Sequence, residues 1–206
     1  ERLSFEVSRV VDLTAHEAEG RFLEGTGSLV LDRVNRVAYA SLSPRTHPEV
    51  VQEWAWEMGY EPVVFSAFDR SGAPLYHTNV LMSIGERAVV IGSEAIPPDE
   101  RAGVLERLAA SGREVIEIGH AQIERFAGNM LELAGRDEAR GERRVLVMSA
   151  SARESLSAET YARLSACTDA VVVAPVPVIE TLGGGSVRCM IAEVFRPERD
   201  ERVGRA

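Results

Sequence analysis

The feature that most constrains the fold of this 206-residue chain is a unit of about 50 residues that recurs along it. The openings of successive units, at Gly27, Asn79, Asn129 and Ser186, are spaced 52, 50 and 57 residues apart. A period of this size is typical of units arranged in a ring or array, in which one unit cannot bury its own apolar face. Accidental similarity of ordinary segments is the alternative, because short element patterns recur often.

Each unit has the pattern of a hairpin, a helix and a further strand. In the first unit, residues 29–32 and 37–41 flank an Arg-Val-Asn-Arg turn, as expected for a hairpin. Thr46-His-Pro-Glu49 has the spacing of a capping box with proline in the first turn, so a helix should begin there and end at Gly59. Residues 62–65 read as the third strand. The strands expected in the next two units are 80–83, 88–91 and 115–118, then 130–133, 145–148 and 171–173.

These units predict an α/β fold of repeated ββαβ units around a pseudo-symmetry axis. We expect a single domain over residues 1–206, with three repeats at about 22–75, 76–126 and 127–182. A partial repeat at 183–195 should hold only its first strands, and 196–206 should be a solvated tail.

Composition narrows the classes of partner. The net charge of −9 disfavours nucleic acid and anionic membranes, whose binding depends on Lys and Arg. We therefore expect a small-molecule partner and no membrane. The chain has no 18-residue apolar run and no signal-peptide pattern at Glu1, so a cytoplasmic location is expected. Two cysteines and four scattered histidines form no disulfide framework and no metal motif, so no metal site is expected.

Cys189 is the candidate nucleophile. It follows the run Gly183-Gly-Gly-Ser, where the backbone must turn sharply or let a ligand approach, and the residues after the glycines read as a strand. The alternative is a buried structural cysteine, since free cysteine is often buried. Cys167, at the end of a helix, and His120, away from the openings, are interpreted as structural.

Glu24 and His77 lie close to unit openings, as Cys189 does, so a ring would gather all three near its axis. An imidazole can take the proton of a thiol and then protonate a leaving amine. A carboxylate can orient that imidazole or hold a cationic substrate. Glu24 as a simple turn residue and His77 as a satisfied strand histidine are the alternatives.

Four motifs carry a family resemblance: Phe22-Leu-Glu-Gly-Thr-Gly-Ser28, Ser43-Pro-Arg-Thr46, His77-Thr-Asn-Val80 and Gly183-Gly-Gly-Ser-Val-Arg-Cys189. In this order they resemble the amidinotransferase or guanidino-group-modifying superfamily, the arginine deiminase-like penteins, and most closely its citrulline utilization hydrolase (citrulline ureidase) branch. The resemblance implies a five-bladed α/β propeller, a cysteine nucleophile, a histidine acid/base and acidic residues that grip the guanidino or ureido group. Three and a part repeats are present here, so the N-terminal repeats of such a ring are expected to be missing before Glu1.

Carried over by residue, the resemblance implies that Cys189 is the nucleophile, His77 the general acid/base and Glu24 the acidic catalytic residue. Arg45 is similar to the arginine that binds the substrate carboxylate in arginine deiminases, although a solvated arginine before a helix would look the same. Asn79 stands where arginine deiminases have aspartate. Because an amide grips a guanidinium less well than a carboxylate does, Asn79 favours a neutral ureido group.

The resemblance therefore implies a hydrolase that acts on the ureido or guanidino carbon of a small amino acid, such as citrulline, which would give ornithine, or an arginine derivative. Transfer to an amine by an amidinotransferase, or a non-catalytic propeller that serves as a binding module, are the alternatives. No cofactor is expected, because the nucleophile and the acid/base are both side chains. A homo-oligomer is compatible with these features.

Overall fold

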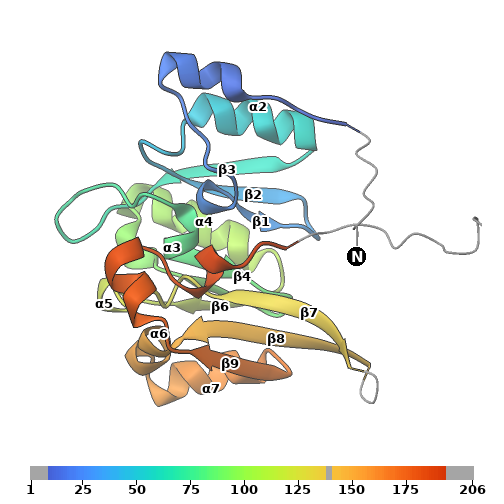
Figure 1. The fold of residues 1–206 in the computed structure, drawn as a ribbon, viewed down its shortest axis with the longest axis vertical. Coiled ribbons are helices and arrows are strands. Elements are labelled where there is room, and N and C mark those ends of the chain that lie inside the picture. Colours follow the sequence, from blue (N-terminus) through green and yellow to red (C-terminus); the bar gives the residue numbers. More distant parts are fainter. Residues whose placement is uncertain (1–8, 138–140, 194–206) are drawn as a thin grey trace, which may run out of the picture.

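The computed structural model describes residues 9–137 and 141–193, and these form three small mixed sheets (Figure 1). In each sheet an antiparallel hairpin is followed by a third strand that pairs in parallel with the second. The strands are β1 Val30–Asp32, β2 Val37–Leu42 and β3 Glu61–Ser66, then β4 Met82–Ile84, β5 Ala88–Ile91 and β6 Glu114–Glu117, then β7 Leu131–Asp137, β8 Gly141–Ser149 and β9 Ala170–Ala174. The predicted α/β class and its ββαβ pattern are confirmed, whereas the described residues form no closed ring of sheets.

Helices connect the second and third strand of each sheet, as a parallel pair requires. These crossover helices are α2 Pro48–Met58, α4 Pro98–Ala109, and the pair α6 Ala150–Ser155 and α7 Ala158–Ala166. Shorter helical segments are η1 Thr14–Glu19, α1 Gly25–Ser28, α3 Thr78–Leu81, η2 Ser93–Ala95, α5 His120–Ile123, η3 Ile179–Gly183 and η4 Val187–Met190. Of the helices in the described part of the chain, none has the length and apolar character needed to cross a bilayer.

The predicted capping box at Thr46 is wrong. Helix α2 begins one residue later, with His47 as its N-cap and no side-chain capping bond. Thr46 is 1% exposed, and its backbone forms isolated β-bridges with Ser43 and Leu23 instead of starting the helix. The other two predicted features of this helix, proline in the first turn and Gly59 in a left-handed conformation at the end, are confirmed.

The three sheets share one main apolar core, and the crossover helices of the second and third units also contact the third strand of the preceding unit. Helix α4 contacts both β6 and β3, and the Glu100 carboxylate accepts a 2.7 Å hydrogen bond from the Ser66 backbone N–H. Helix α7 of the third unit likewise contacts the second unit, because Arg163 forms a 2.6 Å ion pair with Glu114 of β6. The core cluster runs from Val30 in the first sheet to Met148 in the third. This stacking places the openings of neighbouring units side by side.

The strand predicted after the triple glycine is wrong. Residues 179–183 form a π-helical turn and residues 187–190 a 3-10 turn, and no strand follows as far as Glu193. The reason is that no β-ladder partner for this segment exists within the described residues, so its backbone bonds locally, as in the 3.0 Å bond from Cys189 N–H to the Ser186 carbonyl. The end of the predicted partial repeat and the tail at 196–206 lie outside the described residues.

Candidate active site

Hydrogen bonds link the opening of each unit to the opening of the next. The Asn79 Nδ2 donates to the Thr26 carbonyl at 3.1 Å, and the Asn129 Nδ2 donates to the Asn79 carbonyl at 2.9 Å. The same Asn129 nitrogen lies 3.3 Å from the Cys189 Sγ. These bonds bring together four segments that are about 50 to 60 residues apart in sequence.

Glu24 is held at the start of the first unit by its backbone. Gly25 follows with a φ of +49°, which permits the tight α1 turn. The Glu24 N–H donates to the Ser28 Oγ at 2.9 Å, and that hydroxyl donates to the Arg45 carbonyl at 2.8 Å. The backbone is therefore fixed on both sides, while the Glu24 side chain is 44% exposed.

His77 lies directly against Glu24. Its Nε2 is 2.7 Å from the Glu24 Oε2, and its side chain is 15% exposed. The ring packs against the α1 turn at Gly27, where an added Cβ would lie 2.7 to 2.8 Å from three of the ring atoms. Thr78 then anchors the α3 turn, because its hydroxyl donates to the Ser28 carbonyl at 2.6 Å. The sequence thus uses a glycine to let the imidazole reach the carboxylate.

Cys189 is exposed and is presented by the η4 turn after the triple glycine. Gly184 has a φ of +65°, and a Cβ on Gly185 would lie 3.1 Å from the Cys189 Sγ. Ser186, fully buried, donates a 2.6 Å hydrogen bond to the Glu180 carboxylate. Glu180 also accepts from Ser151 at 2.6 Å, so the turn is clamped to the third unit.

Tyr76 connects the His77 side of the site to the cysteine turn. Its ring centroid is 5.1 Å from that of His77, and its hydroxyl donates to the Gly184 carbonyl. Burial, and secondarily the neighbouring Cys189, raise the pKa of Tyr76 above its ordinary value, while the Arg45 charge opposes this. The phenol therefore stays protonated and remains a donor.

The two predicted substrate-binding residues differ in their exposure. Arg45 is about half exposed, with its Nη1 3.5 Å from the Glu24 Oε2. Asn79 is 3% exposed, and its Oδ1 is buried without a hydrogen-bond partner in the described structure. Arg45 can thus reach a ligand directly, whereas the Asn79 amide nitrogen is already bonded to the Thr26 carbonyl.

The predicted residues are thus joined in two groups. Glu24, His77 and Arg45 are in direct contact, and Cys189 is joined to Asn79 through Asn129. Among the described atoms no hydrogen bond joins His77 to Cys189. Sequence reasoning assigned no role in the site to Asn129, Tyr76 or Glu180, although Asn129 was marked as a unit opening.

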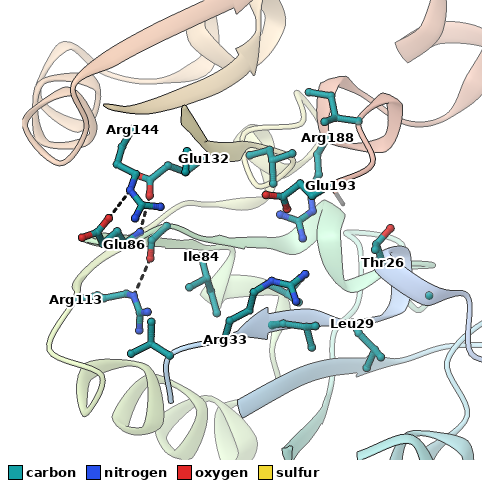
Figure 2. A pocket seen from close by; sticks show the side chains of 18 of the residues that line it. Thr26, Leu29, Arg33, Ile84, Glu86, Arg113, Glu132, Arg144, Arg188 and Glu193 are labelled. Atoms are coloured by element: carbon teal, nitrogen blue, oxygen red, sulfur yellow. Dashed lines mark hydrogen bonds and ion pairs between the residues drawn. The ribbon is translucent and has the colours of Figure 1, made fainter. Parts of the chain in front are cut away.

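A cavity of about 490 Å³ lies beside this site (Figure 2). Gly25 and Thr26, which follow Glu24 in the sequence, line this cavity. The three predicted catalytic residues do not line it. Charged side chains on its walls include Arg33, Arg113, Arg144, Arg188, Glu86, Glu132 and Glu193. A second cavity of about 260 Å³ adjoins Tyr76 and Gly184. Over residues 9–137 and 141–193, no three His, Cys, Asp or Glu side chains are grouped to hold a metal ion.

A family model described as N,N dimethylarginine dimethylhydrolase, eukaryotic, matches residues 1–196. No curated protein sequence gives a significant match. Several solved structures have the same fold. Unliganded AgrE is 20% identical with a TM-score of 0.67, covering 87% of this chain and 24% of that chain.

ArgZ, an arginine dihydrolase from the ornithine-ammonia cycle in cyanobacteria, is 18% identical in its apo form, with a TM-score of 0.65 over 85% of this chain and 25% of that chain. The substrate-bound N-terminal domain of an ArgZ mutant is 17% identical, with a TM-score of 0.61 over 81% of this chain and 54% of that chain. This chain therefore spans about a quarter of the full-length relatives and about half of that domain. On the family match, which covers nearly all of its length, the chain belongs to the eukaryotic N,N-dimethylarginine dimethylhydrolase family, within the pentein superfamily of guanidino-group-modifying proteins.

Proposed function

We propose that this chain carries the active site of a cysteine-dependent hydrolase that acts on the guanidino or ureido carbon of a small amino acid. The observation that carries the proposal is the 2.7 Å contact between Glu24 and His77, at unit openings that also present the exposed thiol of Cys189. Membership of the dimethylarginine dimethylhydrolase family supports it. Structural relatives have been crystallised with L-arginine and with ornithine, which are substrates and products of this chemical class.

The contact with Glu24 fixes which imidazole nitrogen is available. A carboxylate only accepts hydrogen bonds, so the His77 Nε2 carries the hydrogen in the pair. The other nitrogen, Nδ1, is then free in the neutral ring to accept a proton. Glu24 thus orients His77 as a general acid/base, in the way that a third group orients the base in other nucleophilic sites.

The proposed reaction has two half-reactions. The Cys189 thiolate bonds to the central carbon, and the carbon–nitrogen bond breaks as His77 protonates the departing nitrogen. Water, activated by the same imidazole, then adds to that carbon and releases the sulfur. Dimethylarginine would give citrulline and dimethylamine, and citrulline would give ornithine and carbamate. Side chains supply every step, so we propose no cofactor.

Substrate binding is assigned to two side chains. Arg45, half exposed beside Glu24, would pair with the substrate carboxylate. Asn79 would act mainly by holding the openings together, because its amide is buried against Thr26. Its lack of charge still favours the ureido group of citrulline, whereas the family match favours a methylated guanidine.

The arrangement of the whole domain is also part of the proposal. The stepwise bonds from Thr26 to Asn79 to Asn129 support units that turn about a pseudo-symmetry axis, as in a five-bladed propeller. We propose that residues 1–206 belong to one such amidinotransferase-like domain. In the complete ring, closure of the site would bring Cys189 within reach of the substrate carbon and His77, since catalytic contacts often tighten only with substrate bound.

The test is product analysis by mass spectrometry after incubation with dimethylarginine, arginine and citrulline in turn. A Cys189→Ala variant is the catalytic control, and Cys167→Ala is its matched control, because Cys167 bonds to Glu114 instead of to the site. Wild type and Cys167→Ala should turn over one substrate, and Cys189→Ala none. Product formation by Cys189→Ala at the wild-type rate would refute a hydrolase that depends on this cysteine. Added glycine separates a hydrolase from an amidinotransferase, since only a transferase would form a guanidino-glycine product.

A further inference from the structure

Asn129 opens the third unit, two residues before β7, and its side chain is completely buried. The backbone that carries it cannot shift freely. At the preceding Gly128, an added Cβ would lie 2.4 Å from the Val80 carbonyl oxygen, so the third unit is in backbone contact with the second at this point. The Asn129 amide is therefore held by packing between two units.

The orientation of the amide is fixed by its neighbours. Its Nδ2 is 2.9 Å from the Asn79 carbonyl oxygen, which can only accept, so this atom must be the nitrogen. The same nitrogen donates to the Cys189 Sγ at 3.3 Å, and the protonated Cys189 thiol can donate to the Oδ1 at 3.6 Å, a contact that is lost on ionisation. One amide hydrogen thus goes to Asn79, which leaves the other for the sulfur.

A hydrogen bond to sulfur favours its ionised form, because a thiolate is a far better acceptor than a thiol. We propose that Asn129 is a further catalytic residue, which donates to the Cys189 thiolate and stabilises this nucleophilic form of the sulfur. The proposal rests on the proposed function in taking Cys189 as the nucleophile. Tyr76 and Arg188 also interact electrostatically with Cys189, and both are retained in every variant below.

The test measures the reactivity of the thiol directly, so it needs no substrate. Iodoacetamide alkylation of Cys189 is followed by peptide mass spectrometry between pH 6 and 9, in a Cys167→Ser background that leaves one thiol. Asn129→Ala removes the donor, Asn129→Asp replaces it by a charge of similar shape, and Gln52→Ala, at an exposed amide on α2, is the control. Loss of a hydrogen bond to a charged group should slow alkylation of Cys189 at pH 7 about tenfold in Asn129→Ala and further in Asn129→Asp.

An unchanged rate in folded Asn129→Ala would overturn the proposal, and so would a fall confined to Asn129→Asp, because the effect would then be the added charge. If circular dichroism shows that these variants do not fold, the side-chain amide of Asn129 is observed by NMR in wild type and in Cys189→Ala. One of its two hydrogen resonances should move, and movement of neither would refute the donor. Absence of turnover in wild type, with the alkylation difference intact, would count against the proposed reaction and leave the role of Asn129 standing.

Discussion

A buried ion pair between the first two units gives the sharpest test of how the units are held together. Asp32, at the end of β1, accepts hydrogen bonds from both terminal nitrogens of Arg113, at 2.6 and 3.0 Å. The two side chains are 2% and 7% exposed. Arg113 also donates to the Gly85 carbonyl at 2.8 Å, and Asp32 accepts from Asn35 at 2.7 Å, so both charged groups are well satisfied.

The expected cost of breaking this pair follows from its burial. In Asp32→Asn the shape is kept, and the remaining oxygen can still accept from the Val34 and Asn35 backbone N–H groups. The new amide nitrogen cannot accept from Asn35 or Arg113, and Arg113 is left as a buried charge with no counterion. Removal of one partner from a buried pair typically costs about 3–5 kcal/mol. Replacement of both partners, in the double variant Asp32→Asn with Arg113→Met, removes the stranded charge. The double variant should lose less stability than Asp32→Asn alone, and less than the sum of the losses in the two single variants.

Urea unfolding at pH 7 measures the effect. With a slope of about 2 kcal/mol per molar urea, the midpoint of Asp32→Asn should fall by about 1.5–2.5 M. The control is Arg107→Met, which removes the exposed partner of Glu61 in an ion pair at the same interface between units and should cost less than about 1 kcal/mol. If Asp32→Asn and the control Arg107→Met lost similar stability, or if Asp32→Asn lost less than about 1 kcal/mol, the reasoning from burial would be wrong.

Three further outcomes are expected. Gly128→Ala should lower the free energy of unfolding by about 1–3 kcal/mol in urea titrations, because its Cβ would meet the Val80 carbonyl at 2.4 Å. Gly27→Ala should leave stability within about 1 kcal/mol but cut substrate turnover at least about tenfold, because the His77 ring can move away from the new methyl group only by leaving its catalytic position. Burial alone would raise the pKa of Asp32, but hydrogen bonds from Arg113 and others hold it below the ordinary 3.8; the stability difference between wild type and Asp32→Asn should therefore be constant from pH 7 to about 5 and shrink as the pH falls below about 4.

The strands and crossover helices were predictable because each is encoded locally. Runs such as Val37–Leu42 and Ala170–Ala174 carry a strand pattern, and Pro48 and Gly59 mark the ends of a helix. The segment at 187–190 was misassigned because its apolar residues have the composition of a strand. Whether such a run forms a strand depends on a neighbouring strand, which is a property of the tertiary structure and not of the segment.

The site was predictable only as far as the repeat carried it. The spacing of the openings implied that Glu24 and His77 would converge, and they are in contact at 2.7 Å. The link from Asn129 to Cys189 could not be derived, because it depends on which way a buried amide points. Glu180, nine residues before the cysteine, gave no signal either, since its role is to accept hydrogen bonds from the hydroxyls of Ser186 and Ser151.

The two kinds of contact between units have separable consequences. Asp32 ends β1, whereas the opening that carries Glu24 precedes this strand, so the ion pair and the site lie at opposite ends of it. Weakening the ion pair should lower stability while the folded fraction keeps its arrangement of openings. Gly128 lies at the opening itself and positions Asn129, so its substitution should change both. Alkylation of Cys189 in the folded protein should therefore be unaffected by Asp32→Asn and slowed by Gly128→Ala, and equal effects of the two would mean that the interface between units responds as one rigid body.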